Sequence, residues 1–266
     1  MVKGAERGFT IIEVMLFLAI TGGLFAALMV GVSNSITQQR YLDSVRSYKS
    51  LLQQQYSDVL NVRNENLEGK CNTDGSIDEN STRDGKRGTS KCVLLGRAIR
   101  VTNDGKSVVT ASITGYDPIN TGQDSDHDGV PDSSQISNAS DIIVLTNYYK
   151  AKLANFDRAS VDFDWDSQAF AVNDTNSHIS SKSVILIMKS PASGLVRVFV
   201  SEDTDGLLNV NNDLTTFINE TSSAVALKVC IDGNSGLLPK QTVVINPIIA
   251  GPDAVATVDD GSSECK

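Results

Sequence analysis

The chain begins with a long apolar stretch that runs from Phe9 to Val32 and contains one charged side chain, Glu13. A helix of this length, at about 1.5 Å per residue, spans the roughly 30 Å hydrocarbon core of a bilayer. The short segment ahead of it carries Lys3 and Arg7. Because basic flanks tend to stay in the cytoplasm, we expect a transmembrane helix whose N-terminus is cytoplasmic and whose C-terminal side lies outside.

Beyond Val32 the hydrophobic positions take the spacing of an amphipathic helix. Apolar and aromatic residues recur at intervals of three and four, which places them on one face of a helix with 3.6 residues per turn. The residues on this face are Tyr41, Val45, Tyr48, Leu52, Tyr56 and Val59. We therefore predict one continuous helix from about Phe9 to Val62, in which residues 33–62 pack against a globular domain.

Residues 63–266 show a different pattern, with short apolar segments separated by turns, which is typical of β-strands. Three pairs of segments flank glycine-containing turns and are predicted to form antiparallel hairpins. The pairs are Val93–Val101 with Ser107–Thr114, Val184–Lys189 with Leu195–Ser201, and Ala224–Ile231 with Gln241–Asn246. Other expected elements are strands at Asp141–Tyr149 and Gln168–Val172, a short helix at Leu214–Glu220 and an irregular tail at Pro247–Lys266. The predicted fold class is α+β, a long helix packed against an antiparallel sheet.

Glu13 is the residue of the apolar stretch that needs an explanation. A carboxylate at membrane depth costs about 2.5–3.5 kcal/mol on insertion scales, and such groups usually have a partner. No small-x-small cleavage site follows the stretch, so a secretory signal peptide is disfavoured. Cleavage after Gly8 would give Phe9 an α-ammonium group four residues from Glu13, on the same helix face. That amine could pair with the carboxylate of its own chain or of a neighbouring parallel helix.

The segment Gly8-Phe9-Thr10-Ile11-Ile12-Glu13-Val14 resembles the prepilin motif that type IV pilins share with type II secretion pseudopilins and competence pilins. The resemblance implies that residues 1–8 are a leader peptide, which a membrane peptidase removes by cutting after Gly8. It also implies methylation at the nitrogen of Phe9, an assembly contact at Glu13 and a pilin-like fold. The alternative is an ordinary signal anchor with a stray glutamate.

Two further segments, Gly96–Val101 and Val229–Asp232, resemble minor pseudopilins of the H type and related minor pilins. The resemblance implies a minor structural subunit of a type IV pilus or type II secretion pseudopilus, held in the bacterial cytoplasmic membrane before it polymerises. Its partners would be other pilin or pseudopilin subunits and the prepilin peptidase. The alternative function is a single-pass, membrane-anchored calcium-binding surface module that does not polymerise.

The composition bears on two other classes of function, nucleic-acid binding and catalysis. The 266 residues carry a net charge of −9, which disfavours general binding to nucleic-acid phosphates. The two histidines, His127 and His178, stand in polar loops without a nucleophile motif, so we do not expect an enzyme. Trp165 lies among aspartates and is either an exposed contact residue or, as is more common, half-buried at a sheet edge.

Four cysteines follow the apolar stretch: Cys71, Cys92, Cys230 and Cys265. An even number of cysteines outside the cytoplasm indicates disulfides, and the lack of a Cys-x-x-Cys motif disfavours a zinc site. Three pairings are possible. We favour Cys71 with Cys92 and Cys230 with Cys265, because each pair closes a polar, loop-like segment, and reduced cysteines are the alternative.

An acidic loop between the predicted strands has the start of an EF-hand pattern, with oxygen ligands at alternate positions and then a glycine. Its candidate calcium ligands are Asp124, Asp126, Asp128, the carbonyl of Val130, and Asp132. The position usually held by a bidentate glutamate is Gln135, so Asp117 or Asp141 would have to complete the site. We predict calcium binding here, with a solvated acidic loop as the alternative. A weaker second candidate comprises Asp203, Asp205 and Asn209.

Overall fold

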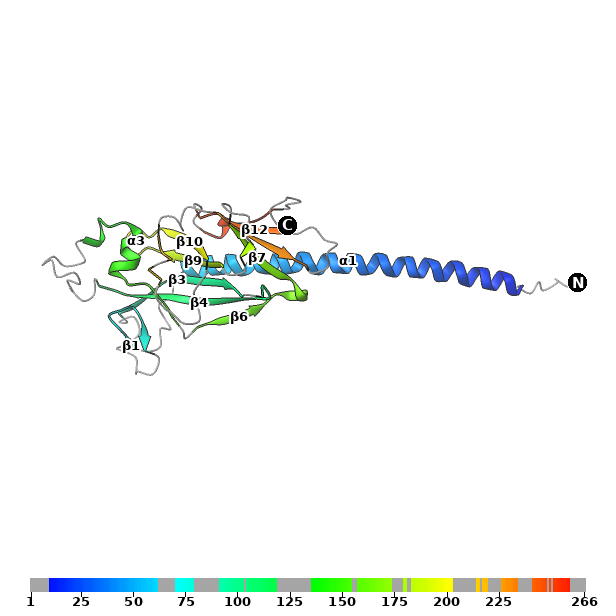
Figure 1. The fold of residues 1–266 in the computed structure, drawn as a ribbon, viewed down its shortest axis with the longest axis horizontal. Coiled ribbons are helices and arrows are strands. Elements are labelled where there is room, and N and C mark those ends of the chain that lie inside the picture. The colour runs from blue at the N-terminus through cyan, green and yellow to red at the C-terminus, as the bar shows by residue number, and fades with distance from the viewer. Residues whose placement is uncertain are drawn as a thin grey trace, which may run out of the picture. The chain divides into compact units, whose positions relative to one another are not determined.

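The structure is a computed structural model. It describes residues 10–61, 70–78, 91–102, 104–118, 135–154, 157–173, 179–180, 183–202, 214–215, 217–219, 226–233, 241–247, 249 and 251–258. Helix α1 (Ile11–Leu60) is 50 residues long, which confirms the continuous helix predicted from the hydrophobic spacing (Figure 1). The chain divides into two compact units, Met1–Asp43 and Ser44–Lys266, so the last part of α1 belongs to the second unit.

The apolar face predicted for the second half of α1 is buried. Its six residues are at most 4% exposed: Tyr41, Val45, Tyr48, Leu52, Tyr56 and Val59. The ring of Tyr48 lies 5.3 Å from the ring of Phe163, measured between centroids. Burial raises the pKa of Tyr48 and of Tyr56 well above the ordinary value, so both phenols stay neutral. From Val45 to Val59, α1 is therefore a core element of the second unit.

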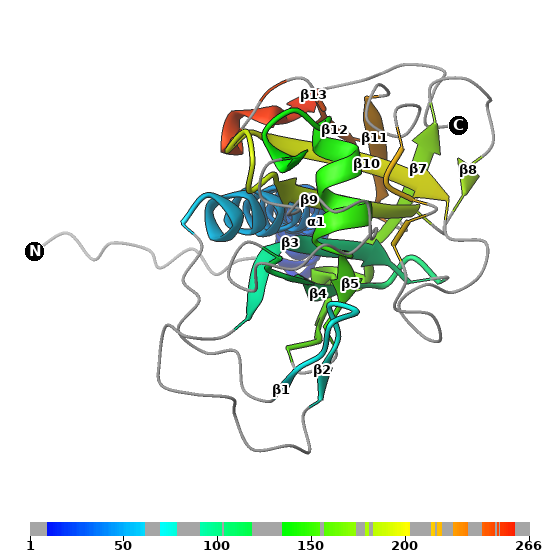
Figure 2. The ribbon, with the colours of Figure 1, turned by 90° about the vertical axis from the view of Figure 1, so that its left-hand side faces the viewer.

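The described residues form three antiparallel sheets (Figures 1 and 2). The largest has six strands in the order β10-β9-β3-β4-β5, with β6 also paired to β4. Its strands are β3 (Cys92–Val101), β4 (Ser107–Tyr116), β5 (Lys152–Leu153), β6 (Ala159–Asp162), β9 (Ser183–Lys189) and β10 (Val196–Glu202).

The second sheet has five strands in the order β13-β12-β11-β7-β8. These are β7 (Gln168–Asn173), β8 (Ile179–Ser180), β11 (Leu227–Asp232), β12 (Gln241–Ile245) and β13 (Val255–Val258), which follows the short turn η5 (Pro252–Ala254). The third is a two-stranded hairpin of β1 (Lys70–Cys71) and β2 (Ile77–Asp78). The antiparallel pairs β3–β4, β9–β10 and β11–β12 confirm the three predicted hairpins, and β7 confirms the predicted strand at Gln168–Val172.

The two faces of the six-stranded sheet are covered by different helices. Successive residues of a strand point to opposite faces. In β3, Arg97 forms an ion pair with Asp58 of α1, at 3.6 Å. Its neighbour Ala98 belongs to a buried cluster that also contains Val144 and Leu145. The sheet therefore lies between the last turns of α1 and the short helical segment 141–148.

That helical segment corrects a prediction, because Asp141–Tyr149 was expected to be a strand. The structure forms a short α-helical turn, α3 (Asp141–Ile143), followed by a π-helical turn, η3 (Val144–Tyr148). The Ser140 hydroxyl accepts a bond from the Ile143 N–H at 3.5 Å and caps the helix. A run of adjacent apolar residues fits a buried strand or a buried helix equally well, and here the cap favours the helix.

Two smaller predictions about the C-terminal part of the chain are also wrong. Within Leu214–Glu220, the Phe217 and Ile218 N–H groups donate to the Leu214 carbonyl, and the described residues form a turn rather than a helix. The segment expected to be an irregular tail, Pro247–Lys266, contains strand β13, which pairs with β12. Edge pairing over four residues gives a weak sequence signal, because it depends on a partner strand rather than on local periodicity.

Candidate functional site

The first candidate site is the start of α1, where Glu13 lies in the first turn. The Thr10 hydroxyl accepts a hydrogen bond from the Glu13 N–H at 3.3 Å, and the Thr10 carbonyl accepts from the same N–H at 3.1 Å. Thr10 is thus the N-cap of α1, a role that the sequence analysis missed. The spacing Thr-x-x-Glu, typical of a capping box, was the signal available for it. A carboxylate is also favoured here because the helix dipole is positive at its N-terminus.

The first half of α1 exposes an unusually large apolar surface. Its large hydrophobic side chains are between 46% and 78% exposed. They are Ile11, Ile12, Val14, Met15, Leu16, Phe17, Leu18, Ile20, Leu24, Phe25, Leu28, Met29, Val30 and Val32. Among the described residues, α1 is the one helix long and apolar enough to cross a membrane. An apolar surface of this extent needs lipid or protein around it.

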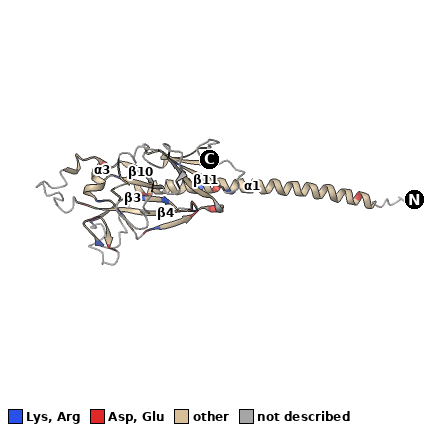
Figure 3. Cartoon of the chain, in the orientation of Figure 1, with Lys and Arg blue, Asp and Glu red and all other residues tan. Residues whose placement is uncertain are grey.

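Within this surface the polar groups are few and mostly satisfied. The Thr21 hydroxyl donates to the Phe17 carbonyl at 2.8 Å, inside the helix. Between Ile11 and Val32, Glu13 is the one ionisable side chain (Figure 3). The structure therefore leaves one carboxylate at the end of an exposed apolar helix. The predicted cleavage and methylation residues, Gly8 and Phe9, lie outside the described residues.

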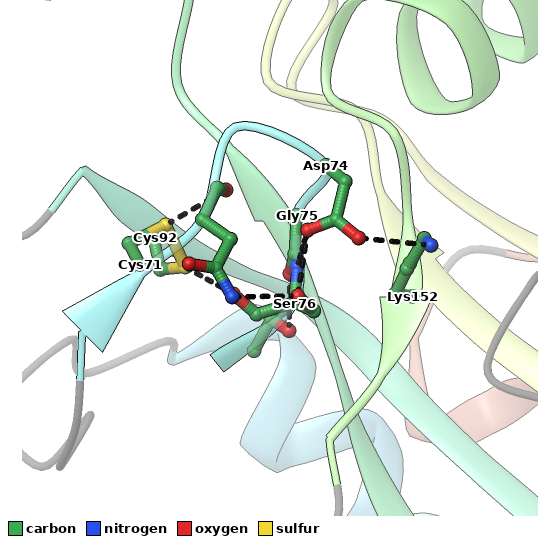
Figure 4. A network of polar contacts seen from close by, with 8 residues as sticks. Cys71, Asp74, Gly75, Ser76, Cys92 and Lys152 are labelled. Atoms are coloured by element: carbon green, nitrogen blue, oxygen red, sulfur yellow. Dashed lines mark hydrogen bonds and ion pairs between the residues drawn. A yellow bond between two sulfur atoms is a disulfide. The ribbon is translucent and has the colours of Figure 1, made fainter. Parts of the chain in front are cut away.

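The second candidate region is the hairpin of β1 and β2, which a disulfide ties to the start of β3 (Figure 4). Cys71 and Cys92 are bonded to each other, which confirms the favoured pairing. Their exposed fractions are 8% and 1%, so this disulfide is shielded from solvent reductants. Cys230 is disulfide-bonded as well, and its expected partner Cys265 lies outside the described residues.

The tip of this hairpin is held against the six-stranded sheet by backbone and side-chain contacts (Figure 4). Gly75 has φ +83°, and a Cβ atom at this position would lie 2.3 Å from the Lys150 carbonyl oxygen, so a side chain cannot fit. The Thr114 hydroxyl donates to the Gly75 carbonyl at 3.2 Å. The Asp74 carboxylate accepts a hydrogen bond from the Ser76 N–H at 3.1 Å and forms an ion pair with Lys152 at 3.2 Å.

These contacts explain the charge state of Asp74. Desolvation alone would raise the pKa of this carboxyl, but the hydrogen bonds from Ser76 and the cation of Lys152 outweigh it and lower the pKa. The carboxylate oxygens of Asp74 are engaged by Ser76 and Lys152. The arrangement is that of a structural turn.

The third region surrounds Asp141, one of the two residues considered for completing the calcium loop. Asp141 is 7% exposed, and its Oδ2 accepts a 2.6 Å hydrogen bond from Nε of Arg197 on β10. Burial would raise its pKa, but hydrogen bonds from Ser193 and Ser190 and the charge of Arg197 together lower it. Asp141 therefore joins α3 to the β9–β10 hairpin.

This network predicts a pH-dependent contribution to stability. Because the pKa of Asp141 in the folded chain lies below its ordinary value of 3.8, its stabilisation is complete above that pH and is lost as the pH falls through the folded pKa. At neutral pH, Asp141→Asn should lower the free energy of unfolding by about 2 kcal/mol. The difference from wild type, measured by urea unfolding, should fade at acid pH. The exposed Asp253→Asn change is the control and should have little effect at any pH.

The predicted metal ligands are not located by the structure. Asp124, Asp126, Asp128, Val130 and Asp132 all lie outside the described residues. So do the weaker candidates, which are Asp203, Asp205 and Asn209. Within the described part of the chain, no three His, Cys, Asp or Glu side chains gather in a way that could hold a metal ion. Gln135 lies at the end of the loop, where its Oε1 accepts a 2.7 Å bond from the Tyr148 hydroxyl.

No family model matches this chain, and neither does any of the curated proteins or solved structures compared with it. The functional argument therefore depends on the residues and contacts of the chain itself.

Proposed function

We propose that the chain is a prepilin-type structural subunit, cut after Gly8 and polymerised through α1 into a type IV pilus or a type II secretion pseudopilus. The observation that carries the proposal is the exposed apolar surface between Ile11 and Val32, with Glu13 as its one ionisable group. The resemblance of Gly8–Val14 to the prepilin motif adds the cleavage position, after Gly8. A minor subunit is the form that fits the H-type resemblance.

The physical logic has two stages. In the membrane, lipid covers the apolar surface of α1, and Glu13 lies near the cytoplasmic end of the helix. In a filament, neighbouring helices would replace the lipid, and the amine of Phe9 would meet Glu13 of an adjacent subunit. The residues Ala19, Gly23, Ala27 and Gly31 recur every four positions, and small residues at that spacing let helices approach closely.

Mass spectrometry of the N-terminus of the membrane-extracted protein tests this proposal. We expect the mature chain to begin at Phe9 with a methylated nitrogen. Gly8→Val should leave full-length precursor, whereas Gly4→Val, the same substitution elsewhere in the leader, should be processed normally. A wild-type protein that keeps Met1 and its first residues would overturn the proposal and favour the membrane-anchored surface module.

We also propose that the Asp124–Asp132 loop binds calcium. The support is its sequence pattern, since four carboxylates so close together repel one another without a cation. A ligand that binds only the folded chain raises its stability. The thermal midpoint should therefore rise with calcium and fall with a chelator, and Asp124→Asn with Asp128→Asn should remove the response. Magnesium is the matched control ion, and a midpoint that ignores calcium would contradict the proposal.

A further inference from the structure

Strand β6 forms an open edge of the six-stranded sheet, and all four of its residues are exposed. It pairs with β4 on one side, and no described strand pairs with it on the other. The Phe163 N–H donates to the Lys106 carbonyl at 2.8 Å, which sets the alternation of hydrogen bonds along the pair. In this register Val161 bonds to β4, while the N–H and C=O groups of Ser160 and Asp162 point away from the sheet.

Two exposed apolar side chains accompany this edge. Val161 is 45% exposed and Trp165 is 54% exposed. Trp165 lies in the 3-10 turn η4 (Asp164–Asp166) with φ 61° and ψ 39°, a left-handed conformation that bulky residues rarely adopt. Trp165 thus presents about half of its indole to solvent beside the β6 edge.

The charge of the edge indicates which partner it suits. Asp162 and Asp164 are both exposed, and no ion pair joins either carboxylate to another described residue. Arg158 precedes the strand at its opposite end. The same edge of a second copy would bring the same two carboxylates against these, so pairing between two β6 edges is electrostatically disfavoured.

We propose that the β6 edge and Trp165 form a docking site for an extended, cationic segment of a partner protein, which joins the sheet as an additional strand. The backbone of the segment would bond to Ser160 and Asp162, as in other cases of strand addition. Its Lys or Arg side chains would pair with Asp162 and Asp164, and one of these cations could also stack on the indole. The proposal does not depend on polymerisation through α1.

Trp165 supplies the readout, because it is the single tryptophan of the chain. The full-length protein in detergent micelles is titrated with a short synthetic peptide of alternating valine and lysine. We expect a saturable shift of Trp165 emission to shorter wavelength, which weakens as salt is added. A peptide of alternating valine and glutamate is the matched control and should give no shift.

Two variants test the geometry. Ser160→Pro removes the outward N–H without touching the bonds to β4, and it should raise the Kd for the lysine peptide about tenfold. Ser160→Ala should bind like wild type. Asp162→Lys combined with Asp164→Lys should abolish binding of the lysine peptide and permit binding of the glutamate peptide. Circular dichroism establishes that each variant is folded.

Four results would overturn the proposal. One is the absence of any shift with the lysine peptide, and another is an equal response to both peptides. The third is a shift that grows with protein concentration without peptide, which would assign the edge to a second copy of the chain. Equal binding by Ser160→Pro and Ser160→Ala would remove the strand-addition geometry.

Discussion

Replacing Glu13 with valine is expected to exclude the chain from filaments while leaving it in the membrane. The substitution removes a carboxylate, a group that costs about 2.5–3.5 kcal/mol at the centre of a membrane helix and less near its end, so membrane residence should become easier. The same change deprives the Phe9 amine of its proposed partner. Loss of one member of a desolvated ion pair costs about 3–5 kcal/mol, which corresponds to a loss of incorporation of at least about a hundredfold.

Fractionation measures this directly, by comparing sheared filaments with membranes after immunoblotting. Thr21→Val is the matched control, because its hydroxyl is bonded within the helix and its loss should not affect assembly. Glu13→Gln separates two roles of the glutamate. A glutamine can still serve a capping box with Thr10, but it cannot pair with an ammonium group as a charge. Incorporation of the valine variant at the wild-type level would contradict the proposed contact.

The parts of the fold that could be predicted from the sequence are those fixed by local patterns. The spacing from Tyr41 to Val59 determines which face of α1 is buried, and the structure buries that face. The Asp-Gly turn between β3 and β4 likewise sets a hairpin, since Gly105 adopts φ +70° there. Such signals lie within a few residues of one another, and the prediction requires no knowledge of distant contacts.

The missed elements depend on partners far away in the sequence. The hairpin of β1 and β2 is held by Cys92 and by Lys152, which lies 78 residues from Asp74. Strand β6 exists because β4 offers it an edge. Its four residues, Ala-Ser-Val-Asp, do alternate between apolar and polar, but the run is short and all four residues are exposed, so it gives only a weak strand signal. At the candidate site, the position of Glu13 follows from the sequence, whereas the exposure and conformation of Trp165 required the structure.

The largest effect on stability is expected at Asp157, between β5 and β6. Along β4 these two strands leave a gap, and Asp157 fills it with its carboxylate. Its Oδ1 accepts from the Ser112 N–H at 2.9 Å, and its Oδ2 contacts Arg97 and the Ser112 hydroxyl. Asp157→Ala would leave the Ser112 N–H without this acceptor. Arg97 would keep its hydrogen bond to the Ser112 hydroxyl, at 2.8 Å, and the longer ion pair with Asp58, at 3.6 Å.

We expect Asp157→Ala to lower the free energy of unfolding by about 3 kcal/mol, because a partly buried cation and a backbone donor lose their acceptor together. Asp58→Ala is the matched control. The Asp58 side chain is 39% exposed, so its loss should cost about 0.5–1 kcal/mol. Urea unfolding of the detergent-solubilised chain measures both, and equal losses would contradict the assignment. Adding Arg97→Met to Asp157→Ala should recover part of the loss, since the cation left by the first substitution is then gone.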